Sequence, residues 1–494
     1  MMVPRHHGKQ QIPRLLHFCI LAISLSLATG IPFGRWRQRR AASSTKQSQP
    51  PKSSSSIHSK ETGALQAKHP IHHLSPADDD NDDVPLIDLS LPEDILIPQI
   101  ARACQSPGFF QVTNHGIDQT LIRAFRHQIK LYYDRPMADK LADKRSAYNA
   151  RGFFDDEYTK QRRDFKQGLD VGVPGSRDWH ALDKDDPRNQ HCLDGLNLFP
   201  QHLPDYRYIT VAYFQACENL AQRLTMLMAR GLEWILLQEQ QPQQQVPSLD
   251  SSISLNSTGI AQDVFLQDMA ANHSSYLRTN YYPPTEQSDD QAKGGVPADD
   301  PDTTLGISPH KDAGFLTILL QDDDCHSLQV PLLQADGRVS WTTVHPRPGA
   351  LTINTGDMAQ VWSNGLYQAP LHRVLTHTTK PRYSAPFFYN PPYHSLIAPL
   401  PHLFPQETSR DESQQRAPLY HPVLWAYFRG LRFAGDWTDL GVEIQIEHFT
   451  KDAPTDYGHL ARQREFIRRG LDGERYNVAK LQELIHTTPA KSNN

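Results

Sequence analysis

Three residues of types that bind metal ions stand in a spacing that could hold one ion. His310 and Asp312 lie two residues apart, and on extended backbone positions i and i+2 project to the same face. His372, at the start of a later predicted strand, is the candidate third ligand. Two imidazoles and one carboxylate leave coordination positions open, and this set suits an Fe(II) ion that must also bind O2 and a chelating co-substrate. Because the chain has 24 histidines, a His-x-Asp triplet can arise by chance and is weak evidence for a metal site by itself. The residues around it must support the assignment.

A second pair could bind a carboxylate. Arg382 follows His372 by ten residues, and Ser384 is placed on the same face of the next predicted strand. A guanidinium can bind a carboxylate through two hydrogen bonds, and a hydroxyl can add a third. The two motifs together predict a metal centre beside an anion site.

The elements that must position these residues are short strands. After residue 305, apolar or alternating runs are separated by Gly, Pro, Asn and Asp, which favours a sandwich or barrel. Trp362 and Phe388 are predicted in the barrel core, Asn354 to Met358 in a turn, and Arg373 on the face away from the metal. The predicted strands are Leu316–Leu320, Leu328–Leu332, Trp341–His345, Ala350–Ile353, His372–His377 and Pro386–Tyr389.

Upstream, the pattern is mixed. Val84–Ser90 and Phe109–Thr113 are predicted strands, and helices are predicted over Pro92–Cys104, from about Ile117 to Ile129, and over Tyr208–Leu237. A further helix is predicted near Leu460–Gly470. The chain should therefore be mainly β with flanking α-helices and a helical N-terminal portion.

Four segments in this order resemble one family, the 2-oxoglutarate- and Fe(II)-dependent dioxygenase superfamily in its isopenicillin N synthase-like branch. The resemblance covers residues 84 to about 450 and implies a double-stranded β-helix (jelly roll) core. The segments are Gly306–Asp322, Pro348–Gly365, Ala369–Val374 and Arg382–Pro391, and Val84–Ser90, Gly108–Gly116 and Asn280–Pro284 are similar to its upstream elements.

The resemblance implies that His310, Asp312 and His372 hold catalytic Fe(II). It also implies that 2-oxoglutarate is held by Arg382, Ser384, Tyr282 and Asn280. The expected reaction consumes O2 and 2-oxoglutarate, with ascorbate in a supporting role. It hydroxylates or desaturates a small organic molecule and releases succinate and CO2. Two alternatives stay open: an Fe(II) oxidase of the same fold that does not use 2-oxoglutarate, and an inactive metal-binding scaffold.

Charge and cysteine content exclude other classes. The formal net charge is −5, and residues 1–60 hold ten basic and no acidic residues, so the remainder is acidic and nucleic-acid binding is not expected. The five cysteines lack CxxC spacing, which argues against a disulfide framework or a zinc site. Cys104 and Cys217 fall in apolar helical patterns and are expected to be buried. The catalytic body is expected to be a monomer without stable membrane insertion.

Five regions are predicted along the chain. Residues 1–30 resemble a signal peptide, and 31–82 form a basic, transit-like or linker segment without regular structure. Residues 83–275 form the N-terminal helical and strand region, 276–400 the catalytic core, and 401–494 a helical C-terminal extension. Polar stretches at 238–262 and 285–303 read as insertions. The leader predicts entry into the secretory pathway, with a plastid as a further possible destination through a bipartite leader.

Overall fold

A computed structural model describes residues 84–146, 149–160, 162–174, 195–240, 259–260, 263–285, 304–324, 326–333, 338–404, 417–435 and 442–468. The predicted leader and linker, and nearly all of both predicted insertions, lie outside these residues. Across the described part of the chain, no helix has the length and apolar character needed to span a membrane.

Two β-sheets form the core. The larger has the strand order β1-β2-β12-β9-β14-β7-β6-β3 and the smaller the order β11-β10-β13-β8. The pairing is antiparallel throughout these two sheets, except between β1 and β2. The strands are β1 (Leu86–Asp88), β2 (Phe109–Thr113), β3 (Gly152–Phe154), β6 (Gln167–Gly172), β7 (Tyr276–Tyr282), β8 (Thr304–His310), β9 (Leu316–Gln321), β10 (Leu328–Leu333), β11 (Val339–Thr343), β12 (Leu351–Thr355), β13 (His372–Thr376) and β14 (Arg382–Tyr389).

All six strands predicted after residue 305 are present, with ends shifted by a few residues. The core strands β3, β6 and β7 were not predicted, although β7 carries Asn280, and β8 was expected only as the extended backbone that carries His310. Strands from both sides of residue 276 share the larger sheet, since β6 pairs with β7 and β2 pairs with β12. The N-terminal region is therefore part of the same sheet as the catalytic core.

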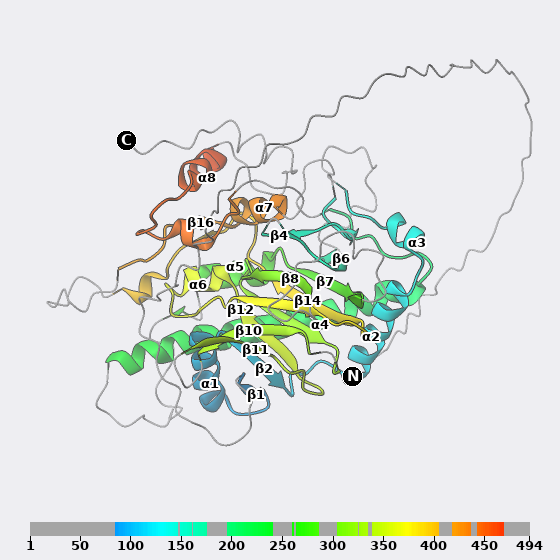
Figure 1. Cartoon of the computed structure of the whole chain (residues 1–494). Helices are drawn as coiled ribbons and strands as arrows, with labels where there is room; N and C mark the ends of the chain where they lie inside the picture. Colours follow the sequence, from blue (N-terminus) through cyan, green and yellow to red (C-terminus); the bar gives the residue numbers. More distant parts are fainter. Residues whose placement is uncertain are drawn as a thin grey trace, which may run out of the picture. The chain divides into compact units, whose positions relative to one another are not determined.

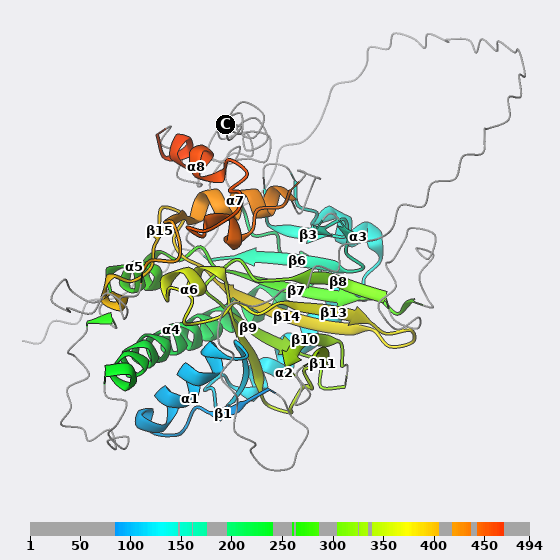
Figure 2. The same cartoon turned by 60° about the vertical axis from the view of Figure 1, so that its left-hand side comes forward.

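Helices cover the sheets on opposite sides (Figures 1 and 2). On one side, α1 (Glu93–Gln105) and α2 (Gln119–Tyr133) pack against the long α4 (Pro204–Gln240). Their apolar faces join the main core, where Cys104 and Cys217 are buried as expected. On the other side lies α7 (Trp425–Gly435), drawn in orange. The fold is thus mainly β with flanking helices.

Smaller elements complete the described chain. The helix predicted near Leu460–Gly470 is present as α8, which spans His459–Arg468. The remaining elements are α3 (Met137–Ala142), β4 (Tyr158–Thr159), β5 (Arg162–Arg163), α5 (Val264–Asn272), α6 (Asp357–Trp362), β15 (Leu396–Ile397), η6 (Pro401–Leu403), β16 (Val423–Leu424), η8 (Ile446–Phe449) and α8 (His459–Arg468).

Candidate active site

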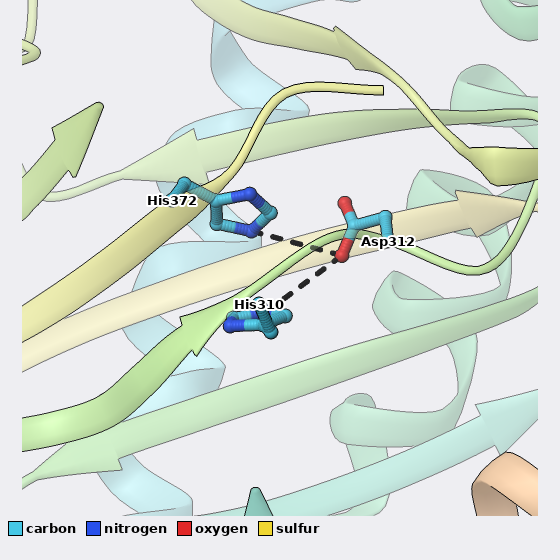
Figure 3. Close-up of side chains that lie close together, drawn as sticks. All are labelled: His310, Asp312 and His372. Atoms are coloured by element: carbon cyan, nitrogen blue, oxygen red, sulfur yellow. Dashed lines mark ion pairs between the residues drawn. The ribbon is translucent and has the colours of Figure 1, made fainter. Parts of the chain in front are cut away.

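The three predicted metal ligands converge at the ends of two paired strands (Figure 3). His310 ends β8 and His372 begins β13, and the two residues are direct partners in this antiparallel pair. Asp312 Oδ1 lies 3.8 Å from His310 Nε2 and 3.7 Å from His372 Nε2. Asp312 is not on the strand, as the i, i+2 argument had assumed, but in the loop that follows β8. This loop turns the carboxylate toward both imidazoles.

Hydrogen bonds to the backbone orient the two imidazole rings. His310 Nδ1 lies 2.8 Å from the Ser308 carbonyl oxygen, and His372 Nδ1 lies 3.2 Å from that of Pro370. Because a carbonyl can only accept, each Nδ1 carries the proton and each Nε2 presents its lone pair to the shared space. Histidine ligands of metal ions commonly use their second nitrogen in this way.

Two side chains hold the far oxygen of Asp312. Thr317 Oγ1 donates to Asp312 Oδ2 at 2.6 Å, and Asn354 Nδ2 donates to the same oxygen at 2.8 Å. Oδ1 is therefore left for a metal ion. Asn354, predicted only as a turn residue, lies on β12 and is a supporting residue that the sequence did not reveal.

The backbone beside this carboxylate is tightly packed. Asp357 N donates to the Asp312 carbonyl oxygen at 2.8 Å, so the start of α6 is tied to the ligand loop. A Cβ on Gly356 would stand 2.3 Å from the Gly314 carbonyl oxygen, which explains the glycine by close backbone approach.

The protonation of His310 and Asp312 suits a bound cation. Burial, with help from the neighbouring His372, lowers the pKa of His310 to about 3. Burial also acts to raise the pKa of Asp312, but the two histidines and the hydrogen bonds from Thr317 and Asn354 hold it below its ordinary value. At neutral pH the site presents an unprotonated imidazole and an ionised carboxylate. Donor atoms, tautomers and charge therefore fit a divalent metal with two imidazole ligands and one carboxylate ligand.

The predicted anion site is built on β14 and its neighbour β7. Arg382 pairs with Tyr282 across these strands, and Ser384 pairs with Asn280. The Arg382 guanidinium lies 4.9 Å from the centre of the Tyr282 ring and donates to Ser384 Oγ at 3.2 Å. All four residues predicted for the co-substrate thus occupy one place.

Some buried hydrogen-bonding groups of this site have no partner within the described part of the chain. Arg382 is only 2% exposed, and its guanidinium contacts the neutral side chains of Ser384 and Gln321, while its Nε is buried without a hydrogen-bond partner. Asn280 Oδ1 is also buried without a hydrogen-bond partner. A buried cation without an anion is costly, so the arrangement favours an anionic ligand. Gln321, whose Oε1 accepts from Arg382 Nη2 at 3.3 Å, is a further contributor that the motifs did not indicate.

A single cavity connects the metal ligands with Arg382. Its volume is about 1070 Å³, including space open to solvent at its mouth.

The prediction that Phe388 lies in the barrel core was wrong. Phe388 is half-buried and lines this cavity, and its ring is stacked on that of Tyr276 with the ring centres 4.7 Å apart. The strand register turns its side chain to the face opposite that of the core residue Phe387. The predictions for Trp362, in the main core, and for Arg373, which contacts Gln329 and Trp341, are confirmed.

A further part of the cavity wall is formed by residues that carried no motif. They come from the β4–β6 segment and from the C-terminal region around α7, far from the signature segments in sequence. These residues are Glu157, Thr159, Lys166, Trp425, Arg429, Arg432 and Glu443. The sequence around these residues matches no motif, so the only signal that could have identified them is that most are charged or aromatic.

Comparisons with known proteins agree with this geometry. Residues 273–391 match the model of the 2OG-Fe(II) oxygenase superfamily, and residues 84–202 match that of the non-haem dioxygenase in morphine synthesis N-terminal region. Jasmonate-induced oxygenase 2 of Arabidopsis thaliana is 29% identical over 70% of this chain and 78% of its own length. Thebaine 6-O-demethylase of Papaver somniferum is 27% identical over 67% and 77%, respectively.

Solved structures give the same result. The crystal structure of JOX2 in complex with 2OG, Fe and JA is similar with a TM-score of 0.52 and 27% identity, covering 70% of this chain and 83% of that one. The full-length Neurospora crassa T7H, solved with alpha-KG and thymine, shares the fold at a TM-score of 0.50 and 20% identity, covering 73% and 98%. The core is therefore a double-stranded β-helix.

The two family models, the relatives and the converging His-Asp-His group lead to one conclusion. The chain belongs to the 2-oxoglutarate- and Fe(II)-dependent oxygenase superfamily, and it is a dioxygenase that uses Fe(II), 2-oxoglutarate and O2 to oxidise a small organic molecule.

Proposed function

We propose that His310, Asp312 and His372 hold the iron, that Arg382 and its neighbours hold 2-oxoglutarate, and that the substrate is a small molecule carrying an anionic group. The first two assignments rest on the geometry above. Bound there, the iron would supply the oxygen chemistry, while the chain orients both organic molecules around it. The third assignment rests on the charge of the rest of the cavity wall.

Charges at the co-substrate end balance once its ligands are bound. A divalent iron and Arg382 bring three positive charges, while Asp312 and the two carboxylates of 2-oxoglutarate bring three negative charges. This half of the cavity therefore requires no charge from the substrate.

Charges on the rest of the cavity wall do not balance. The described residues that line it include five cations and two carboxylates. The cations are Lys166, Arg278, Lys311, Arg429 and Arg432, and the carboxylates are Glu157 and Glu443. In a cavity of low dielectric, such a surplus favours an anion.

Arg429 is the residue that we assign to the anion. Arg432 on the same helix is held by Glu443 at 2.8 Å and by the Lys311 carbonyl oxygen at 2.8 Å. Arg429 lies over the Tyr276 ring at 5.2 Å, and Tyr276 is stacked on Phe388. This places a guanidinium beside an aromatic surface, which suits a substrate with an apolar body and one anionic group.

The relatives do not identify the substrate. Those with named reactions include a homoarginine-6-hydroxylase and a thebaine 6-O-demethylase, each 27% identical to this chain. In the oxidase alternative, Arg382 would bind the substrate's own carboxylate. This alternative is less favoured, because the similar JOX2 structure was solved with 2OG. Counting succinate formed per O2 consumed distinguishes the two reactions.

The test uses matched pairs of carboxylic acids and their methyl esters, supplied to the full chain with Fe(II), 2-oxoglutarate and ascorbate. Product and succinate are measured for each member. We expect turnover of acids but not of their esters. Arg429→Gln should lower kcat/KM for an accepted acid about 30-fold or more, the effect of losing a buried charge pair of about 2 kcal/mol or more. Arg373→Gln, outside the cavity, is the matched control. Esters that react as well as acids would refute the anionic substrate while leaving the 2-oxoglutarate assignment intact.

We also propose that the chain enters the secretory pathway and acts as a monomer. The basic residues and short apolar run of residues 1–30 support the first part. Fusing residues 1–83 to a fluorescent protein tests it, with secretory or plastid location supporting the leader and a diffuse cytosolic signal contradicting it. Light scattering on the purified chain measures its mass and tests the second part.

A further inference from the structure

Two exposed histidines outside the catalytic cavity face each other beside the β10–β11 strand pair of the smaller sheet. His326 Nδ1 lies 2.6 Å from His345 Nδ1, with the ring centres 4.7 Å apart and the ring planes at 71°. Neither residue lines the catalytic cavity. Two imidazole lone pairs repel at such a distance unless a proton or a cation lies between them.

The backbone beneath this pair is fixed. His326 precedes β10 and His345 follows β11, two strands that pair from Gln329 with Thr343 onward. Val344 N donates to the Leu328 carbonyl oxygen at 2.8 Å, which extends the pairing to the positions next to the histidines. Both Leu328 and Val344 are buried. The two rings are therefore presented from a rigid strand pair rather than from mobile loops.

A second contact anchors His345 from the other sheet. Gln111 Nε2 on β2 donates to the His345 carbonyl oxygen at 2.8 Å. The Gln111 side chain is itself buried and also donates to Thr352 Oγ1 at 3.4 Å. A preorganised pair of ligands loses little freedom when it binds an ion, which favours chelation.

Local charge also favours a cation. Asp322, Asp323 and Asp324 precede His326 with one residue between, and Asp324 is exposed. Asp323 is paired with Arg126 at 2.5 Å, and Asp322 accepts from Tyr383 N and lies near Arg126, so Asp324 is the carboxylate whose negative charge this arginine does not offset. The rings stand in solvent, so water can occupy the remaining coordination positions.

We propose that His326 and His345 form a second metal site, which binds a divalent transition-metal ion of the borderline class, such as Zn(II), Ni(II) or Cu(II). Imidazole nitrogens suit these ions, and the general order of affinity places Cu(II) first. Two nitrogens at about 2.1 Å from one ion lie roughly 3.0 Å apart in neighbouring square-planar or octahedral positions and roughly 3.4 Å apart at tetrahedral Zn(II), so the observed pair must open by about 0.4 to 0.8 Å. Mg(II) and Ca(II), which take oxygen ligands, should not bind.

The experiment titrates the metal-free full chain with Zn(II) by calorimetry, in the presence of excess 2-oxoglutarate. Because the catalytic triad and other histidines also bind Zn(II), each variant is compared with the parent chain. We expect His326→Gln, His345→Gln and the double variant each to lose the same single equivalent of Zn(II). His402→Gln, at an exposed histidine of η6, should lose none. His310→Ala should lose a different equivalent, that of the catalytic site.

Two results would overturn the proposal. Single variants that keep the parent's Zn(II) stoichiometry would exclude the site, and a double variant that loses the sum of two separate effects would show two independent histidines. The second measurement uses the unmodified chain, so it does not depend on the folding of any variant. Zn(II) should protect His326 and His345 from acylation by diethyl pyrocarbonate, read by mass spectrometry, whereas Mg(II) should not. Equal acylation with and without Zn(II) would also exclude the site.

Discussion

Replacing Asn354 with alanine tests the support of the iron carboxylate most directly. The substitution removes the 2.8 Å hydrogen bond to Asp312 Oδ2 and leaves the one from Thr317 at 2.6 Å. Asn354 does not touch the expected metal position itself, because Oδ1 is the oxygen turned toward His310 and His372. The effect should therefore reach the iron only through the position and basicity of Asp312.

The magnitude follows from the type of bond. A hydrogen bond to a charged group contributes about 1.5–3 kcal/mol. Loss of a residue that supports a metal ligand typically weakens metal binding about 10- to 100-fold, or about 1.4–2.7 kcal/mol. Because Thr317 continues to hold the same oxygen, we expect Asn354→Ala to lie near the tenfold end. Thr317→Val combined with Asn354→Ala should approach the 100-fold end.

The assay is the affinity of the metal-free chain for Fe(II), measured without oxygen by competition with a chelator. Asn364→Ala is the matched control, since that buried asparagine bonds the Ala417 carbonyl oxygen and Leu419 N, away from the metal ligands. The control should lose stability but keep its iron affinity. If Asn354→Ala also keeps the parent affinity and loses only stability, Asn354 supports the fold rather than the ligand, and the reasoning is wrong.

Three further predictions concern the anion site, the ligand loop and the C-terminal region. Arg382→Gln should weaken 2-oxoglutarate binding by about 2–4 kcal/mol without changing metal affinity, as measured by oxygen-free calorimetry on the Mn(II)-loaded chain; an unchanged affinity would assign Arg382 to another ligand. Gly356→Ala should lower stability by about 1–3 kcal/mol, because its Cβ would meet the Gly314 carbonyl oxygen at 2.3 Å; a parent-like melting temperature would contradict this. Burial, and to a smaller extent the charge of the neighbouring His448, lowers the pKa of His459 from its ordinary value of 6.5 to about 3. Between these two pH values the unfolded chain therefore binds more protons than the folded chain. Stability should therefore fall as the pH drops from about 7 toward 3, by roughly 1 kcal/mol at pH 5.5 from this group, and His459→Gln should flatten that part of the unfolding curve; an identical pH dependence in both chains would refute it.

The sequence by itself determined the chemistry of the centre. The iron ligands and Arg382 with Ser384 lie within short motifs, and the alternation of side chains along β14 places Arg382 and Ser384 on one face. The same local periodicity predicted the six strands after residue 305 and the main helices. Asn280 and Tyr282 were found only through resemblance, and their pairing with Ser384 and Arg382 across β7 and β14 agrees with it.

Only the tertiary structure decided what surrounds that centre. Asn354 reaches Asp312 from a strand more than forty residues away in sequence. The charged part of the cavity wall joins β4–β6 to α7, and Phe388 lines the cavity because its register on β14 turns it there. His326 and His345 meet because β10 and β11 pair. Such contacts depend on which distant segments pack together, and no spacing within a single segment encodes that packing.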